Sequence, residues 1–231
     1  MNREPEPELM NSKEQVKAYS GADFSYGEKK FVDFIIYYLI KNKIKLSCDD
    51  IIVDLGCGPG NISEKLSNKM PEVKVFGIDG SFEMIKMAKD RLFENQNKYK
   101  LDNLSYICTD IKNLHLSKIF PKKNISLLVS NSFIHHLTDI DQFFDCIINL
   151  SSKDTINFHK DLIRPEDEKS ALRLKNQCSL IYNEVLTNDY YASLKASYKK
   201  NELEKKILEK NLYSLDVVED DENYLIVYGK V

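Results

Sequence analysis

The chain has 231 residues, 42% of them hydrophobic, which is enough for one α/β domain with additions or at most two small domains. It carries 33 basic and 36 acidic residues, for a formal net charge of -3. Neither a basic excess nor a basic stripe is present, which disfavours a nucleic-acid ligand. The five cysteines are odd in number, widely spaced and free of any C-x-x-C pair. We therefore expect reduced thiols in a cytoplasmic protein, without a disulfide framework or a zinc site.

The first segment of the chain is rich in proline and glutamate. Residues 1–11 are expected to form a disordered tail, and they lack the apolar core of a signal peptide. Ser12 is placed to cap a short helix over 12–20, and a second helix is expected over about 28–42. That helix contains the longest apolar stretch, which is only about half a membrane span and includes Asp33. We expect no membrane segment.

From residue 50 onward, short apolar runs alternate with amphipathic helices. The runs cover 50–55, 73–79, 104–110, 124–131 and 155–162, and the helices 62–70, 81–95 and 139–150. Such alternation predicts parallel strands joined by crossover helices. After Pro165 the pattern changes, and residues 166–211 indicate helices without a strand. Two final β-like runs, 213–220 and 223–231, are close enough to pair as an antiparallel hairpin.

The strongest signal is the glycine loop VDLGCGPGN at 53–61, after the first run. Gly56, Gly58 and Gly60 allow a tight turn and a close approach of a ligand to exposed backbone N–H groups. The dinucleotide pattern is G-x-G-x-x-G, whereas here the third glycine comes one residue early and position 61 is Asn. A nicotinamide or flavin enzyme is therefore disfavoured. A loop that serves only as a turn is the plain alternative.

Taken together, D-L-G-C-G-P-G and the segments that follow it, across residues 53–161, resemble the class I methyltransferases that use S-adenosylmethionine. The resemblance implies an α/β, Rossmann-like sheet of seven strands, five parallel plus a C-terminal antiparallel hairpin, with helices on both faces. It also implies helical additions at the N-terminus and after the fifth strand. One domain is expected over 12–231, with residues 12–45 as N-terminal helices and lid, and residues 166–211 as an insertion over the acceptor pocket.

The resemblance also assigns roles around the cofactor. Asp79, 23 residues after Gly56, corresponds to the acid that binds the ribose hydroxyls, although it can instead cap a helix, as can Ser81. Asp110 corresponds to the acceptor for the adenine amino group. The full set expected around S-adenosylmethionine is Tyr19, Asp54, Gly56, Cys57, Gly58, Gly60, Asp79, Gly80, Ser81, Met84, Asp110, Ile111, Ser130 and Asn131. Met84 has core packing as its alternative role.

Four residues are candidates for the acceptor side. His135 and His136 resemble an H-H-L segment of the family, and one of them is a candidate general base, with simple packing as the alternative. Because adjacent histidines are expected to point in different directions, we predict no shared metal site. Asp161 and Arg164 follow the fifth run, where they can reach the acceptor or form an ion pair with each other.

The segment KAYSGADF (17–24) resembles the A-Y-x-x-A-D-F opening of a small, mostly uncharacterised methyltransferase group. That group also carries D-L-x-R-P, here 161–165, and a segment similar to 188–198. By this resemblance Tyr19, Asp189, Tyr190 and Ser193 line the acceptor pocket, or else serve in packing and capping. The function predicted is methyl transfer to a small molecule, producing S-adenosylhomocysteine. An RNA or protein acceptor, or a non-catalytic S-adenosylmethionine-binding scaffold, is the alternative.

Overall fold

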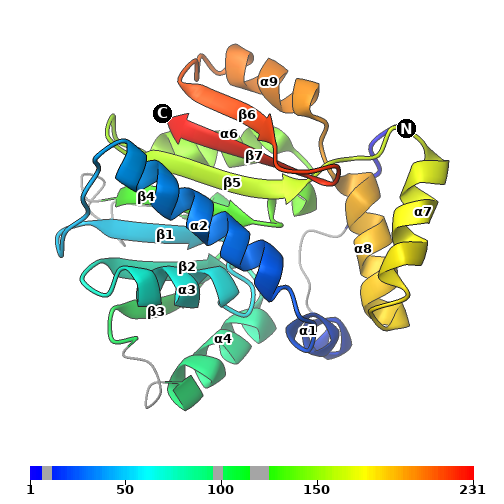
Figure 1. Ribbon diagram of the computed structural model, residues 1–231, viewed down its shortest axis with the longest axis horizontal. Helices are drawn as coiled ribbons and strands as arrows, with labels where there is room; N and C mark the ends of the chain where they lie inside the picture. Colours follow the sequence, from blue (N-terminus) through cyan, green and yellow to red (C-terminus); the bar gives the residue numbers. More distant parts are fainter. Residues whose placement is uncertain (7–11, 96–100, 115–124) are drawn as a thin grey trace.

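The structure is a computed structural model, and it describes residues 1–6, 12–95, 101–114 and 125–231. Within these residues the centre of the molecule is a seven-stranded sheet of order β3-β2-β1-β4-β5-β7-β6 (Figure 1). The strands are β1 (Ile51–Leu55), β2 (Lys74–Asp79), β3 (Leu104–Cys108), β4 (Ile125–Asn131), β5 (Ile156–Leu162), β6 (Leu215–Glu219) and β7 (Tyr224–Lys230). The first strand, β1, lies inside the sheet, with β2 on one side of it and β4 on the other. The carboxyl ends of β1 and β4 therefore lie at the point where the strand order reverses.

Strands β1 to β5 pair in parallel, and β7 pairs antiparallel with both β5 and β6. Parallel neighbours need a crossover, and the amphipathic helices that follow β1, β2 and β4 supply it for the pairs β1–β2, β2–β3 and β4–β5. The short acidic segment between Glu219 and Tyr224 instead returns the chain directly, which makes the last pair antiparallel. The predicted fold is confirmed.

Helices cover both faces of the sheet. One face carries α2 (Ser25–Lys41), α3 (Asn61–Lys69) and α4 (Phe82–Asn95), and the other carries α6 (Ile140–Leu150) and α9 (Lys200–Glu209). Successive residues of a strand point to opposite faces, so Val53 packs with α6 and α9 while Ile52 packs with α2 and α3. Both residues are completely buried. The sheet therefore has two separate apolar cores.

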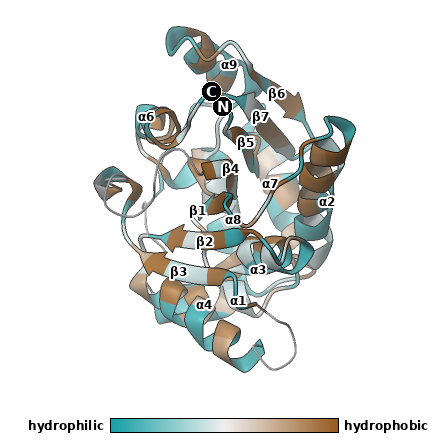
Figure 2. Ribbon diagram, turned by 90° about the vertical axis from the view of Figure 1, so that its left-hand side faces the viewer, coloured by the Kyte–Doolittle hydropathy of each residue, from teal (hydrophilic) through white to brown (hydrophobic). Residues whose placement is uncertain are grey.

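The hydropathy of the helices follows this arrangement. Along α4, brown and teal segments alternate in Figure 2, because Ile85 and Ala88 are buried against the sheet and the intervening residues face solvent. Helix α2 is browner, with Phe31 and Ile35 fully buried. Among the residues that the structure describes, no helix combines the length and apolar character that crossing a membrane would require.

Three helices lie at the carboxyl ends of the parallel strands, on the right of Figure 1: α1 (Lys13–Ser20), α7 (Glu168–Cys178) and α8 (Glu184–Ala196). Ser12 accepts a hydrogen bond of 3.1 Å from the backbone N–H of Gln15, as a cap at that position should. Helix α9 differs from the expected insertion over the acceptor pocket. Its buried Leu203 and Ile207 instead join the core beside β6.

Residues 1–6, which belong to the segment expected to be disordered, lie against the domain; 7–11 fall outside the described residues. Arg3 donates to the backbone oxygens of Ala196, at 2.5 Å, and of Leu137, at 2.6 Å. Its guanidinium also stacks 4.0 Å from the centre of the Tyr198 ring. These carbonyls lie at the end of a helix and of a short turn, where no intrahelical N–H is available, so the Arg3 guanidinium supplies donors that the helix and the turn cannot.

Candidate functional site

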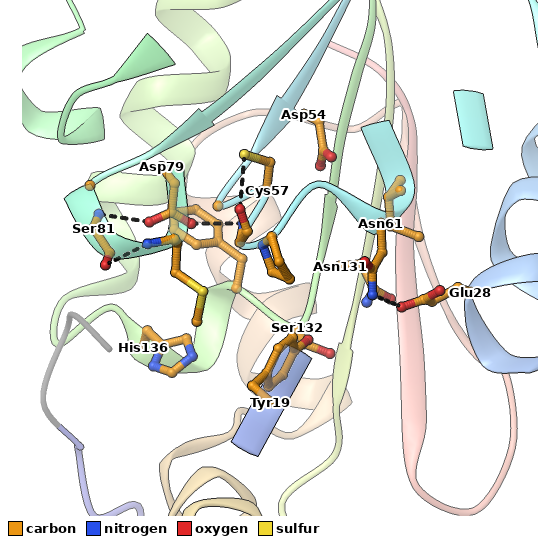
Figure 3. Close-up of a pocket in the computed structure, with 17 residues that line it drawn as sticks. Tyr19, Glu28, Asp54, Cys57, Asn61, Asp79, Ser81, Asn131, Ser132 and His136 are labelled. Carbon is orange, nitrogen blue, oxygen red and sulfur yellow. Dashed lines mark hydrogen bonds between the residues drawn. The ribbon is translucent and has the colours of Figure 1, made fainter. Parts of the chain in front are cut away.

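A pocket opens at the carboxyl ends of β1, β2 and β4, where the strand order reverses (Figure 3). It holds about 740 Å³ of space between atoms, open solvent at its mouth included. Its lining consists of Tyr19, Glu28, Asp54, Gly56, Cys57, Gly58, Pro59, Asn61, Ile62, Asp79, Gly80, Ser81, Met84, Asn131, Ser132, Phe133 and His136.

The glycine loop forms one side of this pocket. Gly56 and Gly58 have φ values of 64° and 52°, in the left-handed region that favours glycine. A Cβ on Gly56 would overlap the Phe133 ring, whereas a Cβ on Gly58 would meet nothing within 4 Å. The first glycine therefore permits close packing against the opposite wall. The second allows the sharp turn of the loop.

Asp79 is the last residue of β2, and its side chain bonds the backbone of the glycine loop. Its Oδ2 accepts from the backbone N–H of Gly58 at 2.9 Å, and its Oδ1 accepts from that of Ser81 at 2.7 Å. Burial raises the pKa of this carboxyl, against the two N–H groups that favour its charged form. A carboxylate offers about four lone pairs, so both oxygens can still accept from hydroxyl groups of a ligand.

Asp54, at the pocket floor, is 1% exposed. Its Oδ2 accepts a hydrogen bond of 2.6 Å from the Ser63 hydroxyl. Burial raises the pKa of Asp54 to about 7 despite that hydrogen bond, and the neighbouring charge of Asp79 adds to the rise. The pocket thus holds two interacting carboxyls that a positive ligand would help to ionise.

Acidic residues outnumber basic ones in the lining of the pocket. Glu28 joins Asp54 and Asp79, and no lysine or arginine lines the pocket within the described ranges. Glu28 is 6% exposed and accepts from the Asn61 amide at 2.6 Å, while Lys65 neutralises it from outside the pocket at 2.8 Å. The arrangement favours a cationic ligand over a phosphate-bearing one.

The opposite wall comes from the end of β4, η3 (Ile134–His136) and α1. Asn131, Ser132, Phe133 and His136 line it, and Tyr19 lies beside Ser132 in Figure 3. Ser132 has a φ of 55°, uncommon for a residue with a side chain, and its N–H donates to the Lys160 oxygen at 2.9 Å. Strained backbone of this kind gathers at functional sites.

Asp161, a predicted acceptor-side residue, is 3% exposed and does not line the pocket. Its Oδ2 accepts from the backbone N–H groups of Phe133 (3.1 Å), Ile134 (2.5 Å) and His135 (3.3 Å), and its Oδ1 bonds His135 Nδ1 at 2.5 Å. Burial opposes ionisation, but the His135 ring and the backbone N–H of Leu162, which donates to Oδ1 at 2.7 Å, lower the pKa of Asp161 below its ordinary value. The carboxylate therefore holds η3 in place.

The two histidines do not point apart as expected. Within η3 the rings of His135 and His136 lie side by side, with centroids 4.3 Å apart and planes tilted by 37°. Only His136 lines the pocket (Figure 3), whereas His135 is 3% exposed and turned toward Asp161. The His135 ring is turned inward because it bonds the Asp161 carboxylate, and Glu6 lies next to both rings.

Arg164 neither reaches the pocket nor pairs with Asp161. It donates to the Ser197 oxygen at 2.8 Å and to Glu202 at 2.5 Å. Of the residues expected near the cofactor, Ser130 bonds His159 at 2.9 Å, and Gly60 accepts from the Tyr106 hydroxyl at 3.3 Å. Four of the cofactor candidates lie outside the pocket lining: Gly60, Asp110, Ile111 and Ser130.

Asp110 accepts from the Lys112 N–H at 2.8 Å and caps η1 (Ile111–Asn113). The capping role was not predicted from the sequence, and the adenine contact stays a prediction. The lining also contains residues that were not predicted: Glu28, Pro59, Asn61, Ile62, Ser132 and Phe133. Most adjoin the glycine loop or the end of β4 and could have been inferred from that position. Glu28 carries no such local signal, because it arrives from a helix far upstream.

Comparison with known proteins places this geometry in a family. Residues 52–153 match the family model described as a methyltransferase domain. Malonyl-[acyl-carrier protein] O-methyltransferase 2 of Ilyobacter polytropus is 30% identical over 129 residues, which are 53% of this chain and 46% of that protein. The corresponding enzyme of Bacillus anthracis is 26% identical over 184 residues, 74% of this chain and 62% of that protein. The chain thus spans about half to three fifths of these relatives' length.

Solved structures share the fold. A methyltransferase of Aquifex aeolicus described as SAM dependent superimposes with a TM-score of 0.62 at 17% identity, covering 93% of this chain and 97% of that one. The plantazolicin methyltransferase BpumL, solved with a desmethyl-plantazolicin analogue and SAH, gives 0.68 at 19% identity, covering 94% and 89%. At such identities the similarity establishes the fold alone.

Proposed function

Residues 52–153 form a class I methyltransferase domain of the S-adenosylmethionine-dependent family, and from that premise we propose that the chain transfers the methyl group of S-adenosylmethionine to a small-molecule acceptor. The predicted family is confirmed by the match.

The charge of the pocket carries the proposal. S-adenosylmethionine bears a sulfonium and an ammonium group, and the lining supplies Asp54, Asp79 and Glu28 without a lysine or arginine among the described residues. Glu28 is paired with Lys65, but a dinucleotide would still bring two phosphate charges close to Asp54 and Asp79, at a cost in free energy. The pocket therefore favours the sulfonium cofactor over NAD. Asp79, beside the glycine loop, is the residue we assign to the ribose hydroxyls.

The chemistry requires little from acid and base groups. Methyl transfer from sulfur is an in-line displacement, in which the acceptor's electron pair forms the new bond while the carbon–sulfur bond breaks. Most of the acceleration then comes from holding the nucleophile about 3 Å from the methyl carbon and in line with it. His136 is on the pocket wall and would accept a proton from an acceptor that loses one. Asp161 acts through η3 as a positioning residue.

A small acceptor fits the surroundings of the site. Tyr19 of α1 stands at the pocket, and α8 packs against both α1 and η3, so helices surround the wall on which an acceptor would lie. Curated relatives are named for malonyl-[acyl-carrier protein] and trans-aconitate, which both present small carboxylic acids. These names support an acceptor that presents a small carboxylic acid, either free or carried as an acyl group by a protein, ahead of RNA.

Calorimetric titration with S-adenosylmethionine, S-adenosylhomocysteine and NAD tests the cofactor. We expect binding of the first two and no binding of NAD. Asp79→Ala should weaken cofactor binding by at least about tenfold, because a hydrogen-bonded charged contact contributes about 1.5–3 kcal/mol. Asp90→Ala removes an exposed carboxylate of α4 and should leave the affinity unchanged. Equal loss in both variants, or NAD binding, would contradict the proposed cofactor.

Acceptor chemistry is tested separately, by S-adenosylhomocysteine release in the presence of small carboxylic acids, phenols and amines, with bulk RNA and protein as comparison. Turnover with a member of the small-molecule panel supports the proposal. Turnover only with RNA or protein refutes the acceptor class and leaves the cofactor intact. Binding without any turnover favours a non-catalytic scaffold.

A further inference from the structure

The N-terminal segment places Glu6 against the two histidines of η3. Its Oε1 lies 3.1 Å from His136 Nδ1 and 3.5 Å from His135 Nε2. One ligand atom from each of the three side chains falls within 4.8 Å of the other two. The side chains of His135, Glu6 and His136 are 3%, 9% and 17% exposed, so the cluster is largely shielded from water.

These separations suit a shared cation. A tetrahedral zinc ion with bonds of about 2.0–2.2 Å to nitrogen and oxygen sets its ligand atoms roughly 3.4 Å apart. Both contacts of Glu6 are near that value. His136 Nδ1 is buried, and the neighbour it faces among the described residues is the Glu6 carboxylate, at 3.1 Å. A cation between these two atoms would be bound by both in place of a proton.

The surroundings of the cluster resemble the second shell of a metal site. His135 Nδ1 bonds the Asp161 carboxylate at 2.5 Å, which leaves Nε2 toward Glu6. A metal-bound imidazole almost always has a carboxylate or carbonyl on its other nitrogen, which fixes the ring. Ser193 in turn donates to Glu6 at 3.1 Å. The first ligands would thus be held in orientation by neighbours.

A further carboxylate stands nearby. Asp189 of α8 accepts from the Gln15 amide through Oδ1 at 3.1 Å, and its Oδ2 is buried without a partner among the residues described. The charges of Glu6 and His136 both act on Asp189. Asp189 does not belong to the cluster whose ligand atoms all lie within 4.8 Å of one another, so it adds negative charge near the site without being counted among its ligands.

We propose that Glu6, His135 and His136 form a binding site for a divalent transition-metal ion of the zinc type. Two imidazoles and a carboxylate suit zinc and its neighbours, whereas magnesium and calcium prefer oxygen ligands alone. Because His136 also lines the pocket, a bound ion would fix this part of the wall and fasten residues 1–6 to it. With Nδ1 on the ion, His136 would keep its proton on Nε2, so in the metal-bound protein it would shape the wall and would not act as the general base. The expectation that the two histidines share no metal is thereby reversed.

The test uses the full chain without a polyhistidine tag, stripped of metal and titrated with Zn²⁺ against a chromogenic chelator. We expect one ion per chain, bound with about micromolar affinity or tighter. Glu6→Gln should weaken binding by more than about a hundredfold, since even loss of an outer neighbour of a ligand costs about ten- to a hundredfold. Glu4→Gln is the matched control, because Glu4 is 61% exposed and pairs only with Lys195 among the described residues.

Co²⁺ provides a second readout that separates this site from the thiols. Cobalt at Glu6, His135 and His136 gives visible bands of nitrogen and oxygen ligation without a thiolate charge-transfer band, and Glu6→Gln removes them while circular dichroism shows an intact fold. The proposal is overturned by weak, non-stoichiometric Zn²⁺ binding, by equal affinity in Glu6→Gln, or by a thiolate band. In that case the cluster is a buried ion pair in which a protonated His135 lies between Asp161 and Glu6.

Discussion

The two halves of the sheet's carboxyl edge use their carboxylates in opposite ways. At β1 and β2, Asp54 and Asp79 line the pocket. At β5, Asp161 turns away from the pocket and accepts four backbone N–H groups and one imidazole. The first region is built to contact a ligand, and the second to hold the wall that the ligand meets. An acid at the end of a strand is therefore no guide by itself to which of these roles it has.

The largest effect is expected from Asp161→Ala. The change leaves four backbone N–H groups and the buried His135 ring without their acceptor, and breaking a buried charged pair costs about 3–5 kcal/mol. We expect a loss of that order in the free energy of unfolding from urea titration. Asp110→Ala, which removes one cap of a short turn, should cost no more than about 1 kcal/mol. If Asp161→Ala unfolds normally but loses methyl transfer, Asp161 contacts the acceptor and the contrast between the two regions fails.

Gly56→Ala should have an intermediate effect. A residue with a side chain pays about 1 kcal/mol or more for a left-handed φ, and its Cβ would overlap the Phe133 ring, at about 1–3 kcal/mol for overpacking. The thermal midpoint and the affinity for S-adenosylhomocysteine should both fall. Gly27→Ala in α2 is the control: its Cβ meets nothing within 4 Å, so helix propensity should stabilise it by up to about 1 kcal/mol. If the two variants had the same thermal midpoint and the same affinity for S-adenosylhomocysteine, the backbone at Gly56 would not be tightly constrained.

The smallest effect is a pH dependence at Asp54. Its folded-state pKa of about 7 lies above the ordinary value, so the folded chain retains a proton that the unfolded chain has lost. This contribution to stability is complete below about pH 4 and disappears as the pH rises through 7. Relative to wild type, Asp54→Asn should therefore gain roughly 2 kcal/mol in unfolding free energy between about pH 5 and pH 8, without ligand. If the difference in unfolding free energy between Asp54→Asn and wild type were the same at every pH, Asp54 would be ionised in the folded chain.

The sequence predicted the cofactor side better than the acceptor side. The glycine loop is continuous in the chain, and its special φ angles restrict the residue type, so the pattern is visible in a few letters. Asp79 was found because it ends the neighbouring strand. Glu28 lines the same pocket but was missed, since a helix far upstream supplies it and nothing nearby marks its destination.

For the acceptor side the sequence placed the right residues at the right edge but could not tell where their side chains point. Asp161 and Arg164 are three residues apart and each found other partners, His135 and Glu202, which lie 26 and 38 positions away. Similarly, residues 1–6 were expected to be disordered, yet Arg3 and Glu6 contact η3 and α8.

Local chemistry therefore determined the fold and half of the site: apolar periodicity gave the order of strands and helices, and glycine spacing gave the loop. The tertiary structure alone decided which charges meet. A buried charged group is costly in free energy unless it is paired. Its partner depends on which distant segments the sheet brings to the same edge. The cluster of Glu6, His135 and His136 is such a product, joining two segments some 130 residues apart.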